Sequence, residues 1–504
     1  MTLIPRTRGG ALWRFFFAAV IIVAATAATT AVAGLLQFKQ LAADLSVGAA
    51  IPHAQIKIAN PGDPQTLLII GSDHRAGEPF NLANTDTMLM VRMDPNSETI
   101  NVMSIPRDLQ VQIPGFGTAK LNAAYSDGGT NLLIKTIQQN VFPAFHASHI
   151  IDVNFAGFIA LVNAIHCVYS DVDHRYYNNT ALTDYASINV QPGYQRLCGF
   201  RALQFVRFRH SDSDLVRNAR QQDFIRWARD QYGVSNLIAN KDTLLRIFGA
   251  HTETDNNLRT IDGLDNLFQL VAFSAGHTIK QIKFPAILQP CPATAAGQTP
   301  CYVTAAPAAE AAVFRAFMRP TTAAAAAKSA GATNAGRKRS SKLQTAGLTD
   351  DSSDGKSQAG AVSRTGMPVY YPRLIVSGSS YCSSLTANCP LEIPSPGSYP
   401  RAYRIKDPQG VVHAAYRMTL QINPVLGQYY GVQGTTWQNP PLLANPTETR
   451  QVAGKKLLLY ANGGKLTAVA WRTPRGVYWI SNTLTTDIPN RELVSIAASL
   501  TRAG

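Results

Sequence analysis

The chain has 504 residues, enough for two or three domains at about 150 residues each. Hydrophobic residues make up 46% and charged residues only 15%, so the composition allows a sizeable core and excludes a chain that is disordered throughout. Lys and Arg number 46 against 31 Asp and Glu. The resulting charge of +15 indicates an anionic partner such as nucleic acid, phosphate, a membrane or a wall polymer.

The first predicted element is a membrane-spanning helix over residues 15–36, which carry no charge and are numerous enough to cross a bilayer. Arg6, Arg8 and Arg14 precede it, so the positive-inside rule places residues 1–14 in the cytoplasm and the rest outside. The alternative is a cleaved signal peptide. Both interpretations export the remainder and exclude a nucleic-acid partner. The length of the stretch favours a single-pass protein of the cell membrane.

Residues 37–60 are expected to form a short stalk, followed by a compact domain over residues 61–290. Short apolar runs that end in turns predict strands, and apolar residues at helical spacing predict helices. The expected strands are residues 67–70, 87–93, 99–105, 150–153 and 279–284, and the expected helices are residues 131–141, 155–165, 202–209, 215–232 and 264–273. Strands that alternate with helices predict an α/β sandwich.

The character of the chain changes after about residue 320. Residues 321–366 are rich in Ala, Ser, Gly and Thr and hold no aromatic residue, which predicts a flexible, disordered linker. Aromatic residues return in 367–504, which we predict to be a smaller α+β domain of unknown type. Its expected strands are residues 414–422, 456–460, 466–471 and 476–480, and a helix is expected over residues 490–501.

Six cysteines all lie beyond the predicted membrane span, and an even number in an exported chain predicts disulfides. No CxxC pair exists, so a zinc site is disfavoured. Other connectivities stay open, but order along the chain suggests the pairs Cys167–Cys198, Cys291–Cys301 and Cys382–Cys389.

Two carboxylates are placed for metal chemistry at neighbouring strand ends. Asp73 directly follows one expected strand, and Asp86 directly precedes the next. Strand ends are where α/β proteins place their sites. Two carboxylates there could hold one Mg²⁺. This ion prefers oxygen ligands and usually keeps bound water and a phosphate oxygen of the substrate. The alternative is that both residues only cap turns.

A cluster of arginines is the second candidate. Arg207 and Arg209 flank the expected end of a helix, and Arg217 and Arg220 share a face of the next helix because they are three residues apart. One guanidinium group can donate two parallel hydrogen bonds to the oxygens of a phosphate, so several converging arginines would suit a pyrophosphate. Arg107, at the end of a strand, is a further candidate. The alternative for all of them is a solvated face with surface ion pairs.

The motifs GSDHR, NTDTM, SIPRD, KLN, DGG and VRFRHSDSDLVRNARQQ occur in this order within residues 71–222. Together they resemble the LytR-CpsA-Psr family of cell-wall glycopolymer ligases. The resemblance implies an α/β/α sandwich and an Mg²⁺-dependent transferase. Such an enzyme moves a glycan from a polyprenyl-pyrophosphate carrier to peptidoglycan as a phosphodiester, usually at the C6 hydroxyl of N-acetylmuramic acid. The partners implied are the lipid-linked glycan, peptidoglycan and the cytoplasmic membrane.

The resemblance also implies roles for individual residues. Asp73 and Asp86 would hold Mg²⁺, and Asn84 stands where the family often has Arg. The expected catalytic residues are Asp73, Asp86, Arg107, Arg207 and Arg209. The expected pyrophosphate-binding residues are Arg75, Arg107, Lys120, Arg207, Arg209, Asp214, Arg217, Arg220 and Gln222.

Some alternatives stay open at this point. Candidates for a general base are Asp73, Asp86 and Asp108. A polyprenyl-pyrophosphate phosphatase would need the same residues with water as acceptor. A non-enzymatic lipid- or wall-binding regulator is a third interpretation, disfavoured because it would not need two metal-binding carboxylates.

Overall fold

The computed structural model describes residues 50–51, 55–73, 83–179, 187–208, 214–274, 277–289, 302–321, 343, 345–383, 389, 398–424 and 426–503. The predicted cytoplasmic tail (1–14) and membrane span (15–36) lie outside these residues. No helix within the described ranges is long and apolar enough to cross a membrane.

The first half of the chain is built on a six-stranded mixed sheet in the order β11-β6-β1-β2-β3-β12. Strands β1, β2 and β3 form an antiparallel meander, whereas β6 joins β1 and β12 joins β3 in parallel. The edge strand β11 runs antiparallel to β6. The strands are β1 Gln65–Ser72, β2 Thr85–Met93, β3 Thr99–Ser104, β6 His149–Asn154, β11 Thr252–Thr254 and β12 Thr278–Gln281.

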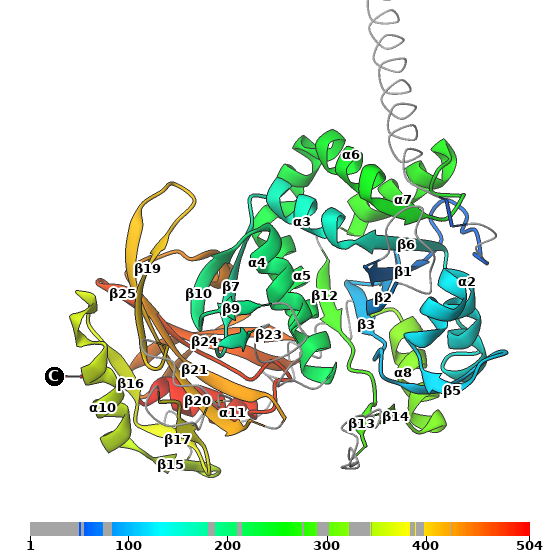
Figure 1. The fold of residues 1–504 in the computed structure, drawn as a ribbon. Coiled ribbons are helices and arrows are strands. Elements are labelled where there is room, and N and C mark those ends of the chain that lie inside the picture. Colours follow the sequence, from blue (N-terminus) through cyan, green and yellow to red (C-terminus); the bar gives the residue numbers. More distant parts are fainter. Residues whose placement is uncertain are drawn as a thin grey trace, which may run out of the picture.

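Both faces of this sheet are covered, because successive side chains of a strand point to opposite faces. On one face, Leu68 and Met90 pack in a core with residues of α2 (Ala123–Asn140) and α8 (Pro307–Met318). On the other, Leu67 packs with residues of α6 (Lys241–His251) and α7 (Ile261–Ser274). This arrangement confirms the predicted α/β sandwich (Figure 1).

Helices α3, α4 and α5 and an antiparallel strand pair lie between this sandwich and the second half of the chain (Figure 1). Helices α4 and α5 pack with strands β7 and β10 in a separate apolar cluster. Gly233 has a φ of 67° and kinks α5. The elements are α3 Phe155–Ala164, α4 Gly199–Arg207, α5 Asp214–Ala239, β7 Val168–Val172, β8 Tyr176–Asn178, β9 Ile188–Val190 and β10 Gly193–Leu197. The sandwich also carries two short pairs of antiparallel strands, β4 Gln110–Ile113 with β5 Gly117–Lys120 and β13 Ile287–Leu288 with β14 Val303–Thr304.

The second half is built on an antiparallel sheet with helices against it. Its strand order is β18-β20-β21-β25-β24-β23-β22, and β19 also pairs with β20. These strands are β18 Ser380–Tyr381, β19 Arg401–Lys406, β20 Val412–Asn423, β21 Gln428–Thr435, β22 Glu448–Val452, β23 Lys455–Asn462, β24 Lys465–Thr473 and β25 Gly476–Ser481. The smaller elements are β15 Leu348–Asp350, α10 Ser352–Ala361, η2 Ser363–Thr365, β16 Tyr370–Pro372, β17 Leu374–Val376, η3 Pro441–Leu443, α11 Asn490–Ala498 and β26 Leu500–Arg502.

The two halves share one buried interface. Tyr169 and Tyr194, on β7 and β10, belong to the same apolar cluster as Trp437 and Trp479 of the second half. At its centre, the Arg417 guanidinium pairs with the Asp171 carboxylate at 3.1 Å, and both side chains are buried.

The structure corrects three predicted boundaries. The stalk was predicted over residues 37–60, but Ile51 is buried in the sandwich core. The first domain was predicted to end at residue 290, but Phe314 and Phe317 of α8 belong to its core, so it extends to about residue 321. The linker was predicted over residues 321–366, but β15 and α10 form within that range as part of the second half.

Most of the predicted elements are present with shifted ends. The helix predicted over 202–209 is α4, which ends at Arg207, and the one predicted over 215–232 is α5, which continues to Ala239. Helix α6 was not predicted. The disulfides Cys167–Cys198 and Cys382–Cys389 form as predicted, whereas the predicted pair Cys291–Cys301 lies outside the described residues.

Candidate active site

The end of β1 and the start of β2 bring the two predicted metal ligands to the same end of these central strands. Ser72 and Thr85 are partners across the strand pair, so Asp73 follows one strand beside the start of the other. Asp73 is fixed there by its backbone, which donates to the Asn84 carbonyl at 3.1 Å. The Asp73 carboxylate accepts a hydrogen bond from the Asn84 N–H. Asp86 is the second residue of β2.

Asp86 is the centre of a three-residue cluster contributed by three different elements. Its Oδ2 accepts a hydrogen bond of 2.9 Å from Nε of Arg207, the last residue of α4. Its Oδ1 accepts from Nη1 of Arg107, in the turn after β3. The Arg207 guanidinium also lies 3.9 Å above the Phe155 ring, a cation–π contact that fixes its plane.

The electrostatics of this cluster keep Asp86 ionised. Burial by itself raises the pKa of the Asp86 carboxyl, but the positive charges of Arg107, Arg217 and Arg207 outweigh burial and hold the pKa below its ordinary value. The cluster is therefore a carboxylate surrounded by permanent cations.

The turn that carries Arg107 is held by the hairpin β4–β5 and by the residues immediately after this hairpin. The Arg107 carbonyl accepts from the Asn122 N–H at 3.0 Å. Next to it, the buried Asp108 carboxylate pairs with the Lys120 ammonium at 2.9 Å. Lys120, predicted to bind the pyrophosphate, thus lies beside Arg107 but engages Asp108.

The two predicted arginines of α5 are both buried. Arg217 is 1% exposed, and its charge reaches Asp86, as the pKa of Asp86 indicates. Arg220 lies 4.4 Å from the Tyr176 ring and donates to the Phe208 carbonyl at 2.9 Å. Because Phe208 directly follows Arg207, Arg220 positions the backbone that carries Arg207.

Gln222, predicted to bind the pyrophosphate, is anchored to the end of β3. Its Nε2 donates to Oγ of Ser104 at 2.9 Å. Arg75 and Arg209 lie outside the described residues. Asp214 is the first residue of α5.

A buried network beside Asp73 was missed by the sequence analysis. The Asp152 carboxylate, on β6, accepts from the Ser72 hydroxyl at 2.7 Å and from the Tyr125 hydroxyl at 2.5 Å. Burial and the negative charge of Asp152 raise the pKa of Tyr125 well above its ordinary value, so Tyr125 keeps its proton. An acid inside the apolar run HIIDVN is the signal that could have identified Asp152. The network positions the chain just before Asp73.

Within the described ranges, no group of three or more His, Cys, Asp or Glu side chains is arranged to hold a metal ion. The predicted magnesium pair, Asp73 and Asp86, is smaller than such a group.

A family model matches this part of the chain. The model, described as the LytR_cpsA_psr family, matches residues 35–305, which is more than half of the 504 residues. The chain belongs to the LytR-CpsA-Psr family. The match contains every motif singled out above and ends before α8, so the second half of the chain lies outside it.

Two curated relatives are named for the same transferase activity. The polyisoprenyl-teichoic acid–peptidoglycan teichoic acid transferase TagU of Oceanobacillus iheyensis is 31% identical over 210 residues, which are 40% of this chain and 62% of TagU. The transferase of the same description, TagT of Bacillus subtilis, is 29% identical over 257 residues, which are 46% of this chain and 79% of TagT. The chain thus spans less than two thirds of the length of the first of these relatives.

Solved structures also resemble this chain. The crystal structure of protein gbs0355 from Streptococcus agalactiae is 23% identical, and the superposition covers 51% of this chain and 86% of that protein with a TM-score of 0.43.

Proposed function

We propose that this protein transfers a glycopolymer from a polyprenyl-pyrophosphate carrier to peptidoglycan, forming a phosphodiester. The observation that carries the proposal is the convergence of Arg107 and Arg207 on Asp86 from separate elements. Membership of the LytR-CpsA-Psr family and the activity for which TagU and TagT are named support it.

The cluster is suited to a pyrophosphate. One carboxylate lies between the two guanidinium groups, so their remaining N–H donors point in fixed directions. Two such donors of one guanidinium can bind two oxygens of the same phosphate. Arg207 is 38% exposed, so part of its donor edge is open to a ligand. Because these side chains are already ordered, little conformational entropy is lost when the ligand binds.

Asp73 and Asp86 would hold Mg²⁺. Their donor set fits, because Mg²⁺ prefers carboxylate oxygens and retains places for phosphate oxygens. Asp86 is ionised, and each of its oxygens keeps a second lone pair beside its arginine. When bound, the ion would neutralise charge on the pyrophosphate oxygens.

In the proposed reaction, the acceptor hydroxyl oxygen forms a bond to the phosphorus next to the sugar. The bond from that phosphorus to the bridging oxygen breaks, polyprenyl phosphate leaves with the electron pair, and the hydroxyl proton passes to solvent. Arg107 and Arg207 stabilise charge on the transferred and leaving oxygens. Asp86 holds both arginines in place. Asp108 is tied to Lys120, so we assign it no role as base. Positioning of the reactants then supplies most of the rate.

We also propose that residues 15–36 anchor the protein in the cell membrane, with the catalytic domain outside. The support is the uncharged stretch behind three arginines, together with two disulfides, which persist in oxidising compartments.

The test is release of polyprenyl phosphate from a lipid-pyrophosphate-linked glycan by the purified full chain. We expect release to require Mg²⁺, to rise with peptidoglycan, and to fall by about 10²-fold or more in Asp86→Ala, as when an oxyanion donor is lost. The matched control is Asp262→Ala, an exposed acid at the start of α7, which should keep the native rate. Release that ignores peptidoglycan would instead identify a phosphatase. Binding without release would identify a non-enzymatic protein.

A further inference from the structure

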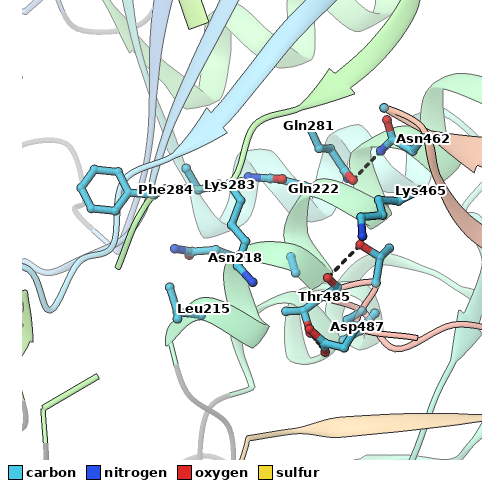
Figure 2. Close-up of a pocket in the computed structure, with 15 residues that line it drawn as sticks. Leu215, Asn218, Gln222, Gln281, Lys283, Phe284, Asn462, Lys465, Thr485 and Asp487 are labelled. Atoms are coloured by element: carbon cyan, nitrogen blue, oxygen red, sulfur yellow. Dashed lines mark hydrogen bonds between the residues drawn. The ribbon is translucent and has the colours of Figure 1, made fainter. Parts of the chain in front are cut away.

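A cavity of about 470 Å³ lies where the two halves of the chain meet (Figure 2). This volume falls within the range of about 300–1,000 Å³ that is typical of ligand pockets. One wall comes from α5 and from the chain at and after β12. The other comes from the turn after β23 and from residues 484–487, which come after β25.

One face of α5 forms part of the wall from the first half. Leu215, Asn218, Ala219 and Gln222 all line the cavity, and their spacing of three and four residues places them on one stripe of the helix. The second half, outside the family match, therefore faces the part of α5 that carries the family's motif.

The cavity adjoins the candidate active site through shared residues. Ser104 and Gln222, which are hydrogen-bonded to each other, both line it. Ser104 lies three residues before Arg107, and Asn218 directly follows Arg217. A molecule in the cavity would thus lie beside the proposed pyrophosphate site.

A hydrogen bond between the halves fixes the rim. Nδ2 of Asn462, at the end of β23, donates to Oε1 of Gln281, the last residue of β12, at 2.5 Å (Figure 2). This bond joins the two walls of the cavity directly.

The lining is hydroxyl- and amide-rich and carries net positive charge. Lys283 and Lys465 are exposed cations on opposite walls, and neither has an ion-pair partner within the described part of the chain. The one carboxylate of the lining, Asp487, already accepts hydrogen bonds from the Thr483 and Thr485 hydroxyls. Amides, hydroxyls and cations recognise a polar, anionic ligand rather than a lipid tail.

We infer that this cavity binds a saccharide that carries negative charge. The assignment rests on the proposed function for its purpose, which is to hold the glycan next to the reacting phosphorus. The second half of the chain is then a substrate-binding element that shapes specificity, with Lys283 and Lys465 as specificity-determining residues.

The test measures the dissociation constants of two saccharides from the purified full chain by calorimetry. The probes are tetragalacturonic acid, which is anionic, and maltotetraose, which is neutral. We expect the anionic probe to bind more tightly, and the double variant Lys283→Glu/Lys465→Glu to weaken its binding by about tenfold or more, because charged hydrogen bonds are lost and repulsion is added.

The matched control is Lys456→Glu, which changes the charge of an exposed lysine on β23 outside the cavity and should alter neither constant. Equal binding of the anionic probe to wild type and double variant, or an equal loss in the control, would overturn the inference. So would the absence of binding at millimolar concentrations.

The two proposals fail in different ways. Saccharide binding needs no turnover. A chain that binds the anionic probe through both lysines but transfers nothing would therefore support the saccharide-binding cavity and contradict the proposed transferase function. Binding of inorganic pyrophosphate should stay unchanged in the double variant, because it reports the arginine cluster. If transfer occurs, a raised KM for the lipid-linked donor would place its glycan in the cavity, and a raised KM for peptidoglycan would place the acceptor there.

Discussion

At the scale of single residues, Asp86 controls the geometry of the arginines around it. Its carboxylate lies between Arg107 and Arg207, and three arginine charges lower its pKa. A carboxyl whose pKa is lower in the folded than in the unfolded state stabilises the fold above its unfolded pKa and loses this contribution only as the pH falls through the folded value. The cluster should therefore stay intact at neutral and mildly acidic pH.

Glu310 gives the opposite pH dependence. It shares the buried face of α8 with Phe314 and Phe317, and burial raises its pKa from 4.5 to about 7. The folded state then holds a proton that the unfolded state has lost, so stability falls as the pH rises from 4.5 to 7 and stays lower above 7. We expect Glu310→Gln to be more stable than wild type by about 1–3 kcal/mol at pH 8.

Denaturant unfolding of both proteins at pH 4 and pH 8 checks this prediction. The gain should vanish at pH 4, where both states of wild type are protonated. A gain of equal size at both pH values would mean that ionisation of Glu310 is not its cause.

The sequence identified the charged residues of the site better than their surroundings. Asp86, Arg107 and Arg207 could be selected because each lies in a recognisable motif at a strand or helix end. Burial of Arg220 among Tyr176, Phe205 and Phe208 could not be predicted, since spacing on α5 does not reveal which face turns inward. There Arg220 donates to the Phe208 carbonyl, while its predicted contact with phosphate stays a prediction.

At the scale of elements, the antiparallel pair of β7 and β10 links the active-site helices to the second half. The Cys167–Cys198 disulfide lies at one end of it, directly beside the paired residues Val168 and Leu197. Helix α4 starts at Gly199, immediately after Cys198, and ends at Arg207. The disulfide therefore fixes the start of the helix that presents Arg207.

We expect loss of this disulfide to be costly because it closes a long loop. Its cysteines are 31 residues apart, so the double variant Cys167→Ala/Cys198→Ala should lose about 3–4 kcal/mol of unfolding free energy. The matched control is Cys382→Ala/Cys389→Ala, whose cysteines are only 7 residues apart, with an expected loss of about 2 kcal/mol. Denaturant unfolding measures both. A larger loss in the control would contradict the loop-closure argument.

Helix α10 was not predicted, because the composition of its segment indicated a linker. Helix α10 lies in a stretch rich in small residues that predicts a linker, but its small residues serve packing. A Cβ on Gly355 would lie 2.6 Å from Tyr371, and Ala359, one turn on, is also buried. Small residues allow α10 to approach β16 closely, and composition alone does not distinguish this use from flexibility.

At the scale of the whole molecule, a buried polar contact joins the two halves. Arg417 donates to one oxygen of Asp171 and the Trp479 indole N–H donates to the other at 2.9 Å. These residues are separated by 246 and 308 positions, so no local pattern in the sequence could have paired them. The separate second domain that was predicted is therefore built onto β7 and β10.

Removal of Asp171 from the ion pair with Arg417 should show how much this contact between the halves contributes to the stability of the fold. Asp171→Ala leaves the Arg417 charge buried, and we expect a loss of about 3–5 kcal/mol in unfolding free energy. The matched control is Asp171→Leu with Arg417→Met, which removes both charges and should recover most of the loss. Denaturant unfolding of the full chain measures both variants. A loss below about 1 kcal/mol in Asp171→Ala would show that the pair behaves like an exposed one.

The most direct test of the whole account is the covalent attachment of a labelled glycan to peptidoglycan. The purified full chain would be incubated with lipid-pyrophosphate-linked labelled glycan, Mg²⁺ and peptidoglycan, and the washed polymer would be analysed for label in a phosphodiester. We predict attachment by wild type and by Asp262→Ala, and a loss of about 10²-fold or more in Asp86→Ala. Washed peptidoglycan without label, in a reaction that consumes the donor, would contradict the assignment as a transferase.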